Sequence, residues 1–369
     1  MGNIARVTLG ILILFCPTGA QGGYSWSTAT LSQGRYWLAG ASAGNQVFFA
    51  GGNSNYGGYG GSNVVDIYNL SSHTWSTATL SQGRQELAAA TAGNQVFFAG
   101  GRTGDSGDSS KVVDIFNITS QTWSTTNLSL ARDRLGAAAL GGQVFFGGGN
   151  ATGQFSNRVD IFDTATQAWT TSSLSQGRMW LSAAAAGGQV LFGGGRIQSG
   201  ASSVVDIYDT TTHTWSTANL SQARYNLAAA AAGGLVFFAG GHTFFDLSDV
   251  VDIYDTSTHS WSTATLSQSG ENLAAVALGD LVFFAGGDND HGKIVDIYNT
   301  TTNTWGTAEL SEWRGALAAA AGGDQVIFAG GNGSTYFSNR VDICTIPEPA
   351  ALSLLALGGL ALFRQRRRK

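Results

Sequence analysis

A unit of about 46 residues recurs seven times along this chain of 369 residues. Every copy carries a tryptophan, a glycine pair and a Val-Asp-Ile triplet in the same order. A fixed period in this range is typical of the blades of a β-propeller. The tryptophans are Trp26, Trp75, Trp123, Trp169, Trp215, Trp261 and Trp305, and the aspartates of the triplets are Asp66, Asp114, Asp160, Asp206, Asp252, Asp296 and Asp342.

Each copy has the pattern of four short strands separated by turns. In the second copy we expect them at residues 87–92, 95–99, 111–116 and 121–125. Alanine runs such as residues 228–232 are too short for helices and suit the strands nearest the axis, where only small side chains fit. The 52 glycines also disfavour a helical bundle. The sequence therefore predicts an all-β fold, a seven-bladed antiparallel β-propeller over residues 21–345.

The first and last copies indicate how the ring closes. Trp26 has no Val-Asp-Ile triplet before it, and Asp342 has no tryptophan after it. We therefore expect the N-terminal strand to pair as the outer strand of the seventh blade, which leaves no exposed sheet edge.

The glycine pair, the aromatic residue after Val-Asp-Ile and the spaced tryptophan resemble the kelch pattern over residues 24–344. The resemblance implies a kelch-type propeller, with an arginine ahead of each inner strand. Two positions depart from the pattern, because Gly270 replaces the arginine of the sixth copy and Cys344 stands where the last aromatic residue belongs. The arginines present are Arg35, Arg84, Arg132, Arg178, Arg224 and Arg314.

Residues 1–20 are typical of a cleaved secretory signal peptide. Arg6 precedes an apolar stretch at residues 7–15, and small residues precede Gln21. A membrane anchor is the alternative, but the stretch is shorter than the ~20 residues of a spanning helix. A lipid anchor on Cys16 would require a small residue where Phe15 stands.

Residues 346–369 combine a Pro-Glu-Pro triplet, a short apolar segment at residues 350–363 and a terminal basic cluster. This order resembles the PEP-CTERM sorting signal of bacterial exported proteins. The resemblance implies processing by an exosortase-type enzyme, transient membrane insertion through a short C-terminal apolar helix, and a location at the cell envelope, the cell surface or outside the cell. A permanent tail anchor is the alternative. The expected sorting residues are Pro347, Glu348, Pro349, Arg366, Arg367 and Arg368.

The remaining charges and histidines exclude several functions. Without the terminal segments, 13 basic residues face 23 acidic ones, a net charge of about −10 that disfavours nucleic-acid binding. His73, His213 and His259 repeat in different copies, too far apart to share one metal ion, and we interpret them as turn residues. We expect no metal, no cofactor and no copper chemistry, since the cysteines and histidines do not converge. No catalytic set is visible either, so an enzyme is disfavoured.

Variation between the copies indicates a binding face. The two residues after the arginine position differ in every copy, and the loops after the glycine pairs carry aromatic side chains. Both stretches share one face of a propeller, and aromatic side chains on polar loops are typical of binding surfaces. Neutral drift between the duplicated copies is the alternative. The candidate binding residues are Tyr36, Trp37, Tyr56, Tyr59, Glu86, Arg134, Trp180, Tyr225, Phe244, Phe245, Trp313, Tyr336 and Phe337.

These observations favour an exported binding module that engages extracellular polysaccharide or a surface protein through the loop face. Two alternatives remain open. One is a sugar-processing enzyme of epimerase or lyase type, for which Glu86, Arg134 and Glu271 should meet in a deep central channel. The other is a purely structural matrix protein.

Overall fold

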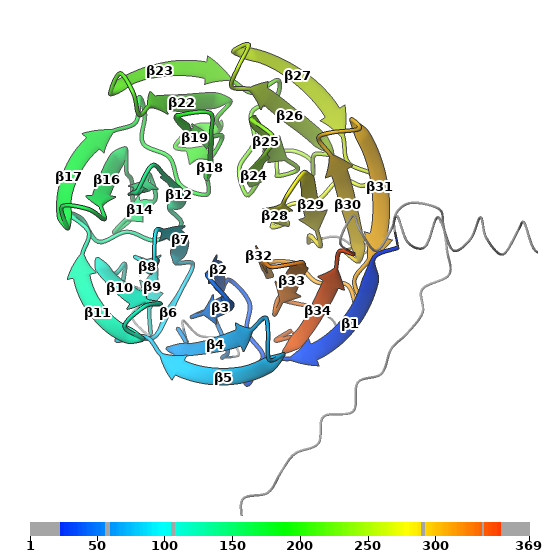
Figure 1. The fold of residues 1–369 in the computed structure, drawn as a ribbon. Coiled ribbons are helices and arrows are strands. Elements are labelled where there is room, and N and C mark those ends of the chain that lie inside the picture. The colour runs from blue at the N-terminus through cyan, green and yellow to red at the C-terminus, as the bar shows by residue number, and fades with distance from the viewer. Residues whose placement is uncertain (1–22, 56–59, 105–107, 289–291, 334–335, 348–369) are drawn as a thin grey trace, which may run out of the picture.

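A computed structural model describes residues 23–55, 60–104, 108–288, 292–333 and 336–347 and contains seven four-stranded antiparallel sheets arranged around one axis (Figure 1). Within these ranges all regular structure is β-strand, which confirms the predicted seven-bladed propeller. No helix capable of crossing a membrane occurs in this part of the chain. The segments 1–20 and 348–369, with the signal peptide and most of the sorting signal, lie outside the described residues.

The blades follow the chain in order. Blade 1 contains β2 (Ala39–Ala43), β3 (Gln46–Ala50), β4 (Val64–Asn69) and β5 (Thr74–Thr79). Blade 2 contains β7 (Ala88–Ala92), β8 (Gln95–Ala99), β10 (Val112–Asn117) and β11 (Thr122–Asn127). Blade 3 contains β12 (Gly136–Leu140), β13 (Gln143–Gly147), β16 (Arg158–Asp163) and β17 (Ala168–Ser173). Blade 4 contains β18 (Ser182–Ala186), β19 (Gln189–Gly193), β22 (Val204–Asp209) and β23 (Thr214–Asn219).

The remaining blades have the same form. Blade 5 contains β24 (Ala228–Ala232), β25 (Leu235–Ala239), β26 (Val250–Asp255) and β27 (Ser260–Thr265). Blade 6 contains β28 (Ala274–Leu278), β29 (Leu281–Ala285), β30 (Ile294–Asn299) and β31 (Thr304–Glu309). Blade 7 contains β32 (Ala318–Gly322), β33 (Gln325–Ala329), β34 (Arg340–Thr345) and β1 (Ser25–Thr30). Three further two-stranded sheets form outside the blades. They pair β6 (Arg84–Gln85) with β9 (Arg102–Thr103), β14 (Asn150–Ala151) with β15 (Gln154–Phe155), and β20 (Arg196–Ile197) with β21 (Gly200–Ala201).

The ring closes through the N-terminal strand, as predicted. β1 pairs antiparallel with β34, and Trp26 lies opposite Cys344. In the other blades the residue opposite the tryptophan is an aromatic residue after Val-Asp-Ile, such as Tyr68 opposite Trp75. Cys344 takes this place in blade 7, where it is fully buried, and burial raises the pKa of its thiol to about 12.

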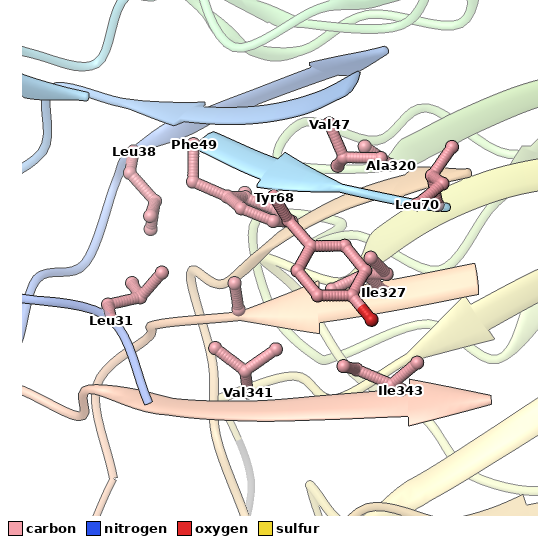
Figure 2. Packing of buried hydrophobic residues seen from close by; sticks show 12 residues of the cluster. Leu31, Leu38, Val47, Phe49, Tyr68, Leu70, Ala320, Ile327, Val341 and Ile343 are labelled. Carbon is pink, nitrogen blue, oxygen red and sulfur yellow. The ribbon is translucent and has the colours of Figure 1, made fainter. Parts of the chain in front are cut away.

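The hydrophobic core lies between neighbouring blades. Between blade 1 and blade 7, Phe49 and Tyr68 pack against Ile327 and Val341 (Figure 2). Alanine-rich inner strands surround the axis in Figure 1. They approach each other closely, because a Cβ atom on Gly40 would lie only 2.6 Å from the carbonyl oxygen of Ala319. Small side chains therefore permit seven sheets to converge.

A buried ion pair ties three segments of the blade together in six of the seven blades. Arg224 in blade 5 pairs with Asp252, and its guanidinium also donates to the carbonyl oxygens of Gly240 and Val250, both at 2.6 Å. Asp252 accepts a further hydrogen bond from the amide of Ser221 at 2.8 Å. The equivalent pairs are Arg35–Asp66, Arg84–Asp114, Arg132–Asp160, Arg178–Asp206 and Arg314–Asp342.

Blade 6 lacks this pair because Gly270 occupies the arginine position. Asp296 keeps hydrogen bonds from the amide and hydroxyl of Ser267, at 3.1 and 3.0 Å. Burial without a charged partner in the described part of the chain raises the pKa of the Asp296 carboxyl.

The repeated histidines lie in turns, as predicted. His73 has a left-handed backbone, with φ of 54°, and its Nδ1 lies 2.9 Å from the hydroxyl oxygen of Tyr68. His213 and His259 make the same contact with Tyr208 and Tyr254. Asn303 accepts the equivalent bond from Tyr298, so the position requires a polar group rather than a metal ligand.

The ion pairs lead to a stability prediction. Asp252→Asn leaves the fully buried Arg224 without a counter-charge, so we expect the free energy of unfolding to fall by about 3–5 kcal/mol. Asp296→Asn leaves no arginine unpaired and should cost less than about 1 kcal/mol. Urea unfolding of both variants measures the difference. Equal losses would show that the ion pair does not govern blade stability.

Candidate functional site

The segment after each arginine meets the loop after the glycine pair on one face of the propeller. The amide of Tyr36 donates to the carbonyl of Asn53 at 3.1 Å, and the amide of Asn53 donates back at 2.7 Å. The same reciprocal bonds join Tyr225 to His242 in blade 5. The two variable stretches of each copy therefore form one continuous surface, the loop face.

A ring of backbone hydrogen bonds surrounds the axis on this face. The second residue after the arginine position contributes one member in every blade, and its amide donates to the carbonyl of the equivalent residue in the preceding blade at 2.9–3.1 Å. All seven have left-handed backbones, with φ between 49° and 56°. The members of this axial ring are Trp37, Glu86, Arg134, Trp180, Asn226, Asn272 and Ala316.

The geometry of the axial ring does not depend on which side chains its members carry. A left-handed backbone costs a residue other than glycine about 1–2 kcal/mol. The hydrogen bonds that close the ring offset this cost and involve only backbone atoms. Since no side chain is needed to build the ring, its positions can carry different residues, and the seven members are of five kinds: tryptophan, glutamate, arginine, asparagine and alanine.

The seven ring residues and the leucine that follows each of them line a pocket of about 220 Å³ around the axis. This volume is below the ~300–1,000 Å³ of sites for drug-sized ligands, so the pocket suits one small ring or the end of a chain. Leucines 38, 87, 135, 181, 227, 273 and 317 provide apolar lining, and the ring supplies two tryptophans, two amides and two charged groups.

Opposite charges meet inside this axial pocket. Arg134 Nε lies 2.9 Å from Glu86 Oε1, and the Arg134 guanidinium lies over the Trp180 ring, 4.6 Å from its centroid. Glu86 Oε2 has no hydrogen-bond donor among the described residues, and the Arg102 Nη1 atom is 4.0 Å away. Burial raises the pKa of the Glu86 carboxyl, although Arg134 opposes the shift. Glu86 Oε2 is buried rather than exposed to the pocket, and the carboxylate is engaged through Oε1 with Arg134.

Aromatic side chains support the two tryptophans from outside the pocket. Trp180 stacks on Tyr225 with ring centroids 5.9 Å apart, and Tyr225 stacks on His242 at 5.2 Å. On the blade 1 side, Trp37 packs against Tyr36 at 4.6 Å, and Tyr36 against Phe337 at 5.7 Å. Blades 1 and 4 lie on opposite sides of a seven-bladed ring, so the tryptophans approach the axis from two directions.

The two asparagines are held by acidic neighbours. Asn226 Nδ2 donates to Glu271 at 2.7 Å, and Asn272 Nδ2 donates to Asp288 at 2.6 Å. Burial raises the pKa of the Asp288 carboxyl. These bonds fix the orientation of both amides at the pocket wall.

The structure divides the predicted binding residues into three groups. Trp37, Glu86, Arg134 and Trp180 line the axial pocket. Tyr36, Tyr225 and Phe337 pack behind them, whereas Phe244, Phe245, Trp313 and Tyr336 are exposed and do not line it. Tyr56 and Tyr59 lie outside the described residues.

Sequence reasoning did not include Asn226, Asn272 or Arg196 among the candidates. The asparagines occupy the same repeat position as Trp37, so alignment of the copies could have identified them. Arg196 Cζ lies 5.8 Å from the centroid of Trp180, and no spacing in the sequence indicates that contact. Glu271 does not line the pocket and contacts it through Asn226, so only two of the three residues expected for an enzyme lie in the pocket. The described residues contain no group of three potential ligands that could hold a metal ion.

Comparisons with known proteins agree with this architecture. A family model for the KLHDC2/KLHL20/DRC7 Kelch-repeats domain matches residues 37–222 and 86–287, which together span more than half of the chain. The solved structure of YjhT is similar in fold, with a TM-score of 0.60 and 15% sequence identity over 76% of this chain and 99% of that one. No curated protein matches the sequence.

The Glu86 environment leads to a pH prediction. Its folded pKa is raised, so the folded state binds the proton more tightly than the unfolded state, whose pKa is about 4.3. The stability of the native protein relative to Glu86→Gln should be highest below about pH 4 and should fall as the pH rises above this and through the raised pKa of Glu86. Urea unfolding of both proteins across this range measures the difference. A difference that increases with pH would contradict the assigned environment.

Proposed function

The chain belongs to the kelch-repeat family, and on that premise we propose that it is an exported binding module that holds a sugar unit of an extracellular polysaccharide in the axial pocket. Kelch propellers are typical protein-interaction modules, so a surface protein is the principal alternative partner. The observation that supports a sugar most directly is the set of side chains at one pocket, with two tryptophans, two amides, the Glu86–Arg134 pair and an apolar lining of leucines.

The chemistry of these groups is complementary to a sugar. A pyranose ring has apolar faces that pack on aromatic side chains, and it carries hydroxyl groups that donate and accept hydrogen bonds. The Arg134 guanidinium and the asparagine amides supply polar groups for such hydroxyls, and Trp37 and Trp180 supply apolar surface. The limited volume of about 220 Å³ favours one sugar unit over a folded protein segment.

A protein partner would use a different part of the loop face. Phe244, Phe245 and Tyr336 are 54%, 84% and 64% exposed, and they lie outside the pocket lining. Exposed aromatic side chains of this kind are frequent in protein interfaces. The two candidate partners can therefore be distinguished by which group of residues binding requires.

An enzyme that processes sugars is the second candidate function. It is favoured by the raised pKa of Glu86 beside Arg134, since a buried carboxyl near a cation can act in proton transfer. Turnover of a bound oligosaccharide, followed by NMR and abolished in Glu86→Gln, would support this candidate. Binding without any change in the ligand would support the binding module.

Export is proposed from the terminal segments. Residues 1–20 would direct secretion, and residues 346–369 would hold the protein briefly at the membrane until an exosortase-type enzyme removes them. Prolines 347 and 349 would keep the processing site extended, since proline and the residue before it avoid helical structure. Basic residues 364–369 would remain on the cytoplasmic side.

Loss of the two axial tryptophans should weaken polysaccharide binding. We expect Trp37→Ala and Trp180→Ala each to weaken binding about tenfold, or ~1–2 kcal/mol, because each removes a large apolar contact. Isothermal titration with oligosaccharides from the polysaccharide of the native host measures the effect. Trp313→Ala is the matched control, because Trp313 lies outside the pocket lining. Unchanged binding in the double variant would exclude the axial pocket.

The terminal segments lead to a separate prediction. If residues 346–369 act as a sorting signal, protein recovered from the native host should lack the C-terminal basic cluster, because processing occurs near the Pro-Glu-Pro triplet. Intact-mass spectrometry measures this directly. A mass that includes residues 364–369 would identify the segment as a permanent anchor.

A further inference from the structure

Six blades hold a guanidinium in the same set of oxygen atoms. The arginine donates to the carbonyl oxygen of the first glycine of the pair, to the carbonyl oxygen of the residue before Val-Asp-Ile, and to the aspartate. In blade 7, for example, Arg314 donates to Gly330 at 2.8 Å and to Arg340 at 2.7 Å, and it pairs with Asp342. All six arginines are fully buried. The space that each guanidinium occupies among these oxygen atoms is called the slot below, and its lining suits a positive charge.

Blade 6 keeps the backbone of this slot without the guanidinium. The amide of Gly270 donates to Ser248 at 3.1 Å, and the amide of Gly241 donates to Gly270 at 2.8 Å. The equivalent bonds of Arg224 in blade 5 are 3.0 and 2.7 Å. Strands β29 and β30 pair Phe284 with Asp296, the same register as in the other blades. The backbone bonds on both sides of Gly270 are therefore kept, although the reciprocal pair that joins Tyr225 to His242 in blade 5 is reduced to one bond in blade 6, from the Asp288 amide to the Glu271 carbonyl at 2.9 Å.

The oxygen atoms that would receive a guanidinium remain in place. They are the carbonyl oxygens of Gly286 and Ile294 and the carboxylate of Asp296. No cation of the described residues lies within ion-pair distance of Asp296, whose carboxylate accepts hydrogen bonds from the amide and hydroxyl of Ser267 at 3.1 and 3.0 Å. Asp296 is also 7% exposed, against 1–2% for the six aspartates that have an arginine, so the slot is more open to solvent.

We propose that blade 6 contains a site for a small monovalent cation, held by the Asp296 carboxylate with the carbonyl oxygens of Gly286 and Ile294. The single carboxylate requires one positive charge, as the guanidinium supplies in the other blades. Carbonyl oxygens can replace the hydration shell of an alkali ion. A divalent ion prefers six to eight oxygen ligands and usually more than one carboxylate, so the site does not suit calcium. The site is independent of what the axial pocket binds.

Thermal unfolding at constant ionic strength tests the site. The melting temperature is first measured in tetramethylammonium chloride, whose cation is too large for the slot. Part of this salt is then replaced by sodium chloride, potassium chloride or 10 mM guanidinium chloride. At 10 mM, guanidinium is too dilute to denature the protein. A bound cation stabilises only the folded state, so we expect the melting temperature of the native protein to rise by about 2 °C. A rise with guanidinium alone would assign a planar cation, and a rise with sodium or potassium an alkali ion.

Two variants serve as controls. Gly270→Arg should supply the missing guanidinium, raise the melting temperature in tetramethylammonium and abolish the response to the small cations. The backbone of Gly270 is not left-handed, so arginine is compatible with it. Asp296→Asn should abolish the response by removing the negative charge. The proposal would be overturned by the absence of any rise in the native protein, or by an equal rise in Asp296→Asn.

Discussion

In six of the seven blades a buried guanidinium fixes the segment from which the candidate site is built. In six blades the arginine joins the connecting segment to the glycine pair and to the Val-Asp-Ile strand, and it is fully buried in all six. The segment that follows is thereby held against the neighbouring loop, and its second residue reaches the axis. Removing one partner of such a pair leaves an uncompensated buried charge, which makes the arrangement sensitive to either residue.

The axial ring allows the side chains around the axis to vary while the backbone keeps one conformation. Seven backbone hydrogen bonds join the blades around the axis, and they do not involve the side chains. The same fold can therefore present Trp37, Glu86 or Asn226 at equivalent positions without a change in backbone conformation. Function on this propeller is a property of a few side chains on a scaffold whose stability depends on other residues.

The repeat predicted the fold because its signals are local and periodic. The strands of the second copy lie within one or two residues of the predicted bounds, and the pairing of β1 with β34 follows from Trp26 and Asp342. The pairing of Arg224 with Asp252 was not predicted, because the repeat shows that both residues recur but not that two side chains 28 positions apart meet in the fold. The site was predicted in part: variation marked Trp37 and Trp180, but only the structure distinguishes the axial ring from the exposed aromatic residues of the outer loops.

The most direct test of the account is a crystal structure of the protein with an oligosaccharide from the extracellular polysaccharide of its native host. We expect electron density for a sugar unit inside the axial ring, in contact with Trp37 or Trp180 and hydrogen-bonded to Arg134. Ligand density confined to the outer loops around Phe244 and Phe245, with the axial pocket occupied only by water, would contradict it.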